Sequence, residues 1–131
     1  MNEDGITPSP PGTKGWDLDL AHGKAGEAFL RRILAGKHET KRDRKTWETR
    51  NVVVEFECRG QPSGIATTES KWWSFVLDGP DGKPYSTVTV PLARLLTIAG
   101  RRYAEGYWRY GGDDNQAKMV LVPVAMLVAW G

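Results

Sequence analysis

The chain has 131 residues, of which 40% are hydrophobic and 26% are charged, and its formal net charge is +2. This composition predicts one soluble globular domain and excludes a disordered or membrane-embedded chain, because no apolar run approaches the ~18 residues of a membrane helix. The first residues lack the layout of a signal peptide, and the single cysteine, Cys58, excludes an internal disulfide and a cysteine-based zinc site, as is typical of a reducing cytosol.

The N-terminal segment is divided by composition into a tail and a helix. Residues 1–15 are rich in proline and glycine, which predicts a flexible tail, and residues 16–131 then form a single domain. From about Asp19 to Ala35 the apolar residues recur at helical spacing, and Gly36 stands where a C-terminal cap belongs. Glu27 shares a helix face with two leucines, a position typical of the solvent-exposed edge of an apolar stripe.

Two charged segments then predict an antiparallel hairpin, residues 37–43 and 51–58 joined by "RKTWETR". Alternation places Glu39, Lys41 and Asp43 on one face of the first strand. It places Val53, Glu55 and Glu57 together on one face of the second strand. One register sets Glu39 opposite Glu55, so that two carboxylates lie side by side with a lysine next to them.

The remaining segments alternate between turns, strands and helices. The patterns predict a turn at 60–64 and then a short helix carrying Trp72, Trp73 and Val76. A strand at 86–90 and a helix at 91–100 follow. The last part is predicted to be an extended stretch and loop over 101–118, a strand at 119–123 and a closing apolar helix or strand. Together they predict an α/β (α+β) fold.

Basic residues cluster in two places. Eight of them fall between positions 31 and 50, and arginines 101, 102 and 109 interleave with Tyr103, Tyr107, Trp108 and Tyr110. Such clusters are typical of phosphate binding and of surfaces that stack unpaired bases, although a solvated basic surface and ordinary strand aromatics have the same composition. In "QPSG", Ser63 and Gly64 indicate either a backbone approach to phosphate or a plain tight turn.

The strongest chemical signal is Glu39-Thr40-Lys41 together with carboxylates at positions 27, 43, 55 and 57. Mg²⁺ and Mn²⁺ prefer oxygen ligands, and a nearby lysine positions an attacking water and offsets phosphate charge. These are the parts that metal-assisted phosphodiester hydrolysis needs. A Glu-x-Lys sequence also occurs in ordinary solvated strands, so the spacing alone is not specific.

Three stretches, "GEAFLRRILAG", "HETKRD" and "RNVVVEFECRGQPSGIATTESKWWSF", resemble the PD-(D/E)XK nuclease superfamily. The closest likeness is to its small phage and prokaryotic members that are similar to Holliday junction resolvases. The late "GGDDN" loop and the following "LVP" extend the resemblance to roughly residues 16–125. It implies a restriction-endonuclease-like fold with a mixed central β-sheet flanked by helices, a magnesium-dependent (or manganese-dependent) cleavage of DNA, and a cytoplasmic protein encoded by a bacterium or a phage.

The resemblance also implies roles for particular residues. Glu27 matches a helix glutamate that touches a metal-bound water, Glu39 a metal ligand and Lys41 the catalytic lysine. The superfamily usually has an aspartate on the strand before Glu-x-Lys, and this chain lacks it. In the alternative alignment Glu39 takes that aspartate position and Glu55-Phe56-Glu57 is the second motif. Whether Lys41 or Glu57 occupies the lysine position therefore stays open.

We therefore expect a structure-selective Holliday junction resolvase that acts as a two-fold dimer on branched DNA. Its metal is held by Glu39 and Glu55, with Glu27, Asp43 or Glu57 in support. The residues expected to bind DNA are Arg31, Arg32, Lys37, Arg42, Arg44, Lys45, Arg50, Ser63, Arg101, Arg102 and Arg109. The alternatives are a general duplex endonuclease, an RNA-processing nuclease, and a DNA-binding module without catalysis, in which Lys41 and Lys37 simply neutralise Glu39 and Glu55.

Overall fold

A computed structural model describes residues 14–129, with side chains from residue 20 onward. Contacts divide the chain into an N-terminal unit that ends at Gly36 and a second unit that begins at Lys37. Most of the predicted tail, residues 1–13, lies outside the described residues, whereas Lys14 and Gly15 belong to the first helix. The prediction of one domain over residues 16–131 stays a prediction.

The N-terminal unit contains the helix α1 (Lys14–Ala35), which begins earlier than the predicted Asp19. Glu27 and Arg31 lie one turn apart on it, with 3.7 Å between the carboxylate and the guanidinium. This order of acid before base supports a helix, and Arg32 in the last turn is favourable to the helix dipole. At the end of the helix the Gly36 N–H donates to the Ile33 carbonyl at 3.1 Å.

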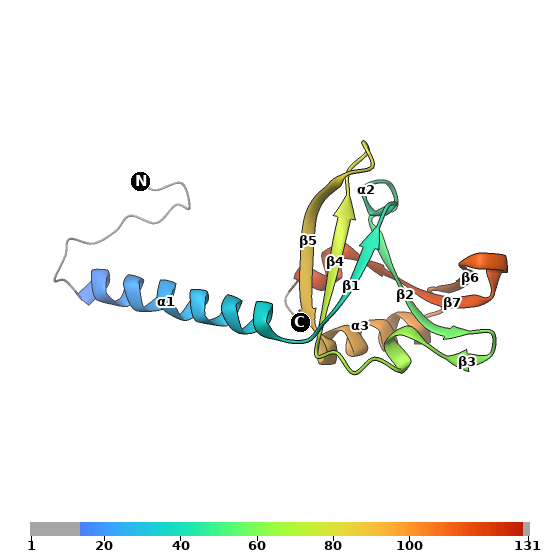
Figure 1. Ribbon diagram of the computed structural model, residues 1–131, viewed down its shortest axis with the longest axis horizontal. Helices are drawn as coiled ribbons and strands as arrows, with labels where there is room; N and C mark the ends of the chain where they lie inside the picture. The colour runs from blue at the N-terminus through green and yellow to red at the C-terminus, as the bar shows by residue number, and fades with distance from the viewer. Residues whose placement is uncertain (1–13, 130–131) are drawn as a thin grey trace. The chain divides into compact units, whose positions relative to one another are not determined.

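The second unit begins with a mixed sheet, here called sheet A (Figure 1). Its strands are β1 (His38–Asp43), β4 (Trp72–Asp78) and β5 (Pro84–Pro91), with β4 in the middle. The strand β1 runs parallel to β4, and β4 runs antiparallel to β5. The predicted strand at 86–90 is therefore confirmed, whereas the predicted short helix around Trp72 and Trp73 is wrong.

The predicted hairpin of residues 37–43 and 51–58 is also wrong, because the link between these strands folds into the short helix α2 (Thr46–Thr49). The Asp43 carboxylate accepts hydrogen bonds from the backbone N–H groups of Lys45 at 2.8 Å and Thr46 at 3.0 Å, which satisfies two donors at the helix start. At its end Arg50 adopts a left-handed conformation with φ 66°. The chain then enters a different sheet.

That second sheet, sheet B, is antiparallel with the order β3-β2-β7-β6. Its strands are β2 (Asn51–Cys58), β3 (Gln61–Pro62), β6 (Trp108–Gly111) and β7 (Ala117–Pro123). The predicted strand at 119–123 is confirmed and begins two residues earlier. Between Glu55 and Glu57 the register with β7 shifts by one residue, which leaves a β-bulge at Phe56.

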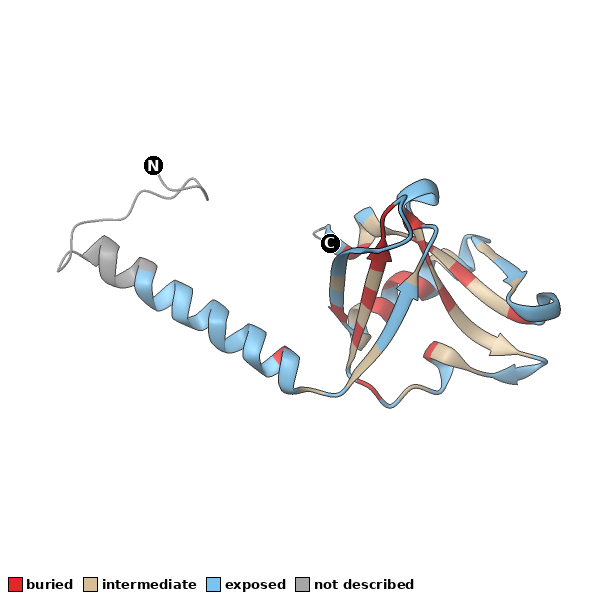
Figure 2. Cartoon of the chain, turned by 45° about the horizontal axis from the view of Figure 1, so that its top comes forward, coloured by how far each residue is buried: buried red, intermediate tan, exposed pale blue. Residues whose placement is uncertain are grey.

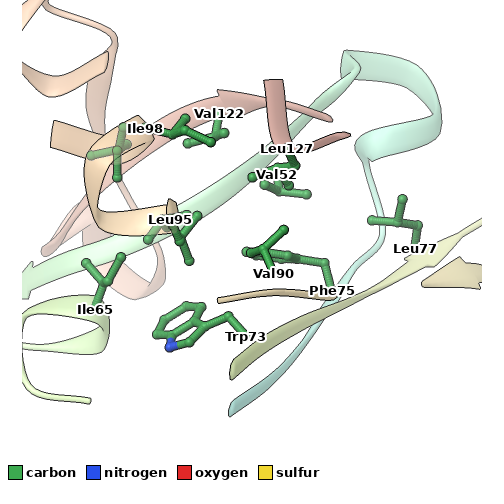
Figure 3. Packing of buried hydrophobic residues seen from close by; sticks show 13 residues of the cluster. Val52, Ile65, Trp73, Phe75, Leu77, Val90, Leu95, Ile98, Val122 and Leu127 are labelled. Carbon is green, nitrogen blue, oxygen red and sulfur yellow. The ribbon is translucent and has the colours of Figure 1, made fainter. Parts of the chain in front are cut away.

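The core lies among the two sheets, α3 (Leu92–Ala104), the short helix η1 (Gly64–Ala66) and α4 (Val124–Val128) (Figure 3). Buried and less buried residues alternate along the central strands, as expected for sheets with one covered face (Figure 2). The fully buried side chains include Val52, Val54, Trp73, Phe75, Leu95 and Val122. Burial of each such side chain contributes about 1.5–3 kcal/mol to folding.

The predicted fold class, α+β with a mixed sheet flanked by helices, is confirmed. The predicted helix at 91–100 is confirmed as α3, which follows Pro91 and continues to Ala104. The 3-10 turn η2 (Asp113–Asn115) occupies the predicted late loop. Over residues 14–129, none of the helices has the length and apolar character that crossing a bilayer requires.

Candidate nucleic-acid interface

The side chains of Glu39 and Lys41 lie on the core-facing side of sheet A. In the parallel register, Glu39 is beside Trp73 and Lys41 beside Phe75, so these four side chains share a face. The Lys41 ammonium is 3.0 Å from the Glu39 carboxylate and 5.9 Å from the centre of the Trp73 ring. The predicted common face of Glu39 and Lys41 is therefore present, and the two groups neutralise each other.

The two glutamates of β2 lie on opposite faces of sheet B, and the prediction that they share a face is wrong. Glu55 is paired with Met119, on the face that points away from Val52 and Val54. Because of the bulge at Phe56, the side chain of Glu57 lies on the opposite face from Glu55, and Glu57 pairs with Lys118 on the core-facing side. The distance from the Lys118 ammonium to the Glu57 carboxylate is 3.0 Å. The hydrogen bond to Glu57 raises the pKa of Lys118.

The predicted metal ligands of the second unit are therefore divided between its two sheets. Glu39 and Asp43 belong to sheet A and Glu55 and Glu57 to sheet B, and Glu27 lies on α1 beside Arg31. Among the described residues, no group of three or more His, Cys, Asp or Glu side chains is arranged to hold a metal ion. Asp43 is engaged by backbone N–H groups at the start of α2. This donor set does not fit the magnesium site that the resemblance implies.

Basic residues, in contrast, gather around one open pocket of about 740 Å³, here called the basic pocket. Its floor is the outer face of sheet B, with Val53, Met119 and Leu121. Its rim comes from the β1–α2 connection, the β4–β5 turn and β6. Four basic side chains line it, namely Arg42, Arg44, Lys45 and Arg109, against the single carboxylate of Asp43.

One of these basic groups is held rigidly. The Arg42 Nε donates to both carboxylate oxygens of Asp78, at 2.9 and 3.1 Å, and its Nη2 donates to the Gly82 carbonyl at 3.1 Å. The hydrogen bond to Asp78 raises the pKa of Arg42. Within residues 20–129, no carboxylate forms an ion pair with Arg44, Lys45 or Arg109. These three cations are therefore available to pair with an anionic ligand.

The other residues predicted to bind DNA lie elsewhere. Lys37 is 3.6 Å from the Glu69 carboxylate. Arg102 donates to the Leu121 carbonyl at 2.9 Å and stacks 3.6 Å from the centre of the Tyr107 ring.

The Ser63 hydroxyl is buried without a hydrogen-bond partner among the described residues, so it does not face a ligand at the surface. Arg31 and Arg32 lie on α1, Arg101 is exposed on α3, and Arg50 lines a second pocket.

Trp47 is a pocket residue that was not among those predicted from the sequence. It is exposed by 43% and lines the basic pocket next to Lys45. The signal that could have identified Trp47 is its position as a lone tryptophan in the polar link "RKTWETR". An aromatic ring between cations provides a stacking surface for nucleobases.

Comparison of the chain with protein-family models, with curated proteins and with solved structures gave no match.

Proposed function

We propose that this protein binds DNA through the basic pocket. The observation that carries the proposal is the meeting of two distant basic segments: Arg42, Arg44 and Lys45 come from one, and Arg109 comes from the other. The two segments are separated by more than sixty residues of sequence, yet they supply the rim of the same concave surface. A concentration of cations in a hollow raises the local concentration of a polyanion.

The chemistry of the pocket suits a phosphate backbone. Arginine and lysine neutralise phosphates and release condensed counterions, which supplies most of the affinity of sequence-independent binding. Arg42 is oriented in advance by Asp78. No carboxylate of the described residues pairs with the other three cations, Arg44, Lys45 and Arg109. The apolar floor formed by Val53, Met119 and Leu121 offers little for reading base edges, so the expected preference is for shape and charge.

The test is fluorescence anisotropy with a labelled duplex over a series of salt concentrations. Arg44→Ala and Arg109→Ala each weaken binding by about fivefold, and each lowers the slope of log K against log salt by about 1. Arg101→Ala, which removes an exposed arginine outside the pocket, changes neither quantity. Equal effects of all three substitutions, or no binding at low salt, would reject the basic pocket as the binding site.

A second candidate function is Mg²⁺-dependent DNA cleavage, as in a dimeric junction resolvase. The 3.0 Å approach of Glu39 and Lys41 on one face of β1, with Asp43 next on that face, favours it. The separation of Glu55 and Glu57 from these residues, on the other sheet, weighs against it.

Cleavage is tested with a labelled four-way junction and a matched linear duplex, in Mg²⁺ or EDTA. The variants are Glu39→Ala, Lys41→Ala and Glu57→Ala, and the control is Thr40→Ala, an exposed residue on the opposite face of β1. Paired nicks in the junction that disappear with EDTA and in the Glu39 and Lys41 variants would support a resolvase. Equal cutting of both substrates would support a general endonuclease. Binding without cleavage would leave DNA binding as the function.

A further inference from the structure

A second pocket, of about 540 Å³, adjoins the basic pocket. Trp47, Gly79 and Pro80 line both, so these residues form the wall between them. The second pocket, here called the apolar pocket, lies among α2, the β4–β5 hairpin and the start of α4. Its volume is within the range of pockets that bind small organic molecules.

The walls of the apolar pocket are largely aromatic and aliphatic. Its side chains include Trp47, Leu77, Pro80, Tyr85 and Val124. Tyr85, on β5, is 85% exposed. Exposed aromatic rings beside a hollow are typical of sites that stack planar ligands.

The polar groups deep in this pocket already have partners. The Thr46 hydroxyl donates to the Asn51 carbonyl at 3.0 Å, and the Asp78 carboxylate accepts from Arg42. Within the described residues, the side chains of Arg50, Tyr85 and Ser86 form no hydrogen bond. They therefore provide donors for the polar edge of a ligand whose faces contact aromatic rings. A planar heterocycle has this combination of an apolar face and a polar edge.

We propose that the apolar pocket receives one unpaired base of a DNA strand whose phosphates lie in the basic pocket. The inference rests on the proposed function, because the cations of the neighbouring pocket bring the strand to the wall at Trp47. A base that crosses this wall stacks on Trp47 and Tyr85 and presents its edge to Arg50 or Ser86. A fully paired duplex has no unpaired base to place in the apolar pocket, so it binds to the basic pocket alone.

The test compares three labelled duplexes of one sequence: fully paired, with one extra unpaired thymidine, and with an abasic unit in place of that thymidine. The wild-type protein binds the duplex with the unpaired base about tenfold more tightly than the other two. Tyr85→Ala brings this ratio close to one without changing the affinity for the paired duplex. Tyr110→Ala, which removes a tyrosine that is 54% exposed and lines neither pocket, leaves the ratio unchanged.

The outcomes separate this inference from the proposed function. If the paired duplex binds with the expected dependence on Arg109 but the unpaired base adds no affinity, the base pocket is rejected and the basic pocket stands. An unchanged ratio in Tyr85→Ala also rejects the base pocket. If none of the three duplexes binds at low salt, the proposed function fails first and the inference fails with it.

Discussion

At the scale of single residues, Asp78 is the most completely buried charged group among the described residues. Its side chain is fully covered, whereas its partner Arg42 is half exposed. A buried carboxylate needs hydrogen bonds to offset the loss of its hydration, and Arg42 supplies two of them. Arg42 therefore has a structural role in addition to its place at the rim of the basic pocket.

This dual role predicts that Arg42→Ala destabilises the fold. The substitution leaves the Asp78 carboxylate buried without its partner, so the midpoint of urea unfolding falls. Arg44→Ala, two residues along, removes a cation without an ion pair and changes the free energy of unfolding by no more than about 0.5 kcal/mol. Both variants bind DNA less tightly. A midpoint for Arg42→Ala that equals the midpoint for Arg44→Ala would contradict the structural role.

Lys118 makes stability depend on pH in the alkaline range. Its hydrogen bond to Glu57 raises its pKa in the folded state above the usual 10.5, and the neighbouring Tyr110 adds to this effect. A raised pKa means that the folded state holds the proton more tightly. The stabilising contribution is therefore complete below pH 10.5 and is lost as the pH rises through the folded-state pKa.

We expect the free energy of unfolding to fall more steeply above pH 10.5 in the wild type than in Lys118→Met. Urea unfolding of both proteins on either side of this pH gives the difference, in which the titration of distant lysines and tyrosines cancels. Glu57→Gln should reduce the same component. Parallel pH profiles for all three proteins would show that the ion pair does not contribute.

At the scale of elements, the turn before η1 brings the chain back against β2. Gly64 has φ +55°, and a Cβ at this position would collide with the backbone carbonyl of Glu55. Gly60 also has a positive φ, +78°, but no atom lies within 4 Å of the place of its Cβ. A substitution is therefore strained in its backbone conformation at both glycines, whereas only at Gly64 does the new side chain also lack space.

Gly64→Ala should consequently cost about 3 kcal/mol, from left-handed strain and from overpacking against β2 together. Gly60→Ala should cost only about 1 kcal/mol, because it has the strain alone. Chemical unfolding of the two variants measures this difference. Similar losses in both would mean that η1 shifts away from β2 without penalty.

The sequence predicted elements where local pattern decides, and it failed where distant pairing decides. The alternation at 86–90 and the amphipathic run after Pro91 were sufficient for a strand and a helix. The paired tryptophans at 72 and 73 fit a short helix equally well by local pattern, and only pairing with β1 and β5 makes this segment a strand. The predicted hairpin failed for the same reason, because the true neighbour of β1 begins nearly thirty residues after it ends.

The features of the candidate site also divide into those that local sequence pattern predicts and those that depend on distant pairing. Basic clusters are visible in composition, and the sequence predicted all four cations of the basic pocket as DNA-binding residues. That Arg109 joins the cluster at residues 42–45 depends on the packing of sheet B, which no local pattern contains. The predicted convergence of carboxylates required a hairpin and an unbroken strand. Two separate sheets and the bulge at Phe56 remove both conditions.

At the scale of the whole molecule, one cluster of buried hydrophobic residues lies within the second unit, and Ile33 of α1 is buried outside this cluster. Every residue of the buried cluster lies between Val52 and Leu127, and both pockets are lined by residues after Gly36. The N-terminal unit contributes no side chain to this cluster among the described residues. We therefore expect the second unit to fold on its own.

A chain of residues 37–131 should accordingly unfold cooperatively, with a midpoint within about 4 °C of the full chain, a shift that corresponds to less than about 1 kcal/mol. Calorimetry of both chains gives this comparison. DNA binding then separates the contribution of α1, which carries Arg31 and Arg32, from that of the basic pocket. Loss of cooperative unfolding would show that residues 16–131 fold only together.

Among the described residues, the strand β1 stands at the edge of sheet A, with β4 as its one neighbour. An open edge presents unpaired N–H and C=O groups to which a strand of another molecule adds readily, and charged side chains on the edge oppose this addition. In "HETKRD" every residue except Thr40 is ionisable. We therefore expect the charges on β1 to oppose edge-to-edge joining of separate copies. Replacing Glu39 and Lys41 together with alanine removes part of this barrier, and light scattering at increasing protein concentration should reveal aggregation that the single variants resist.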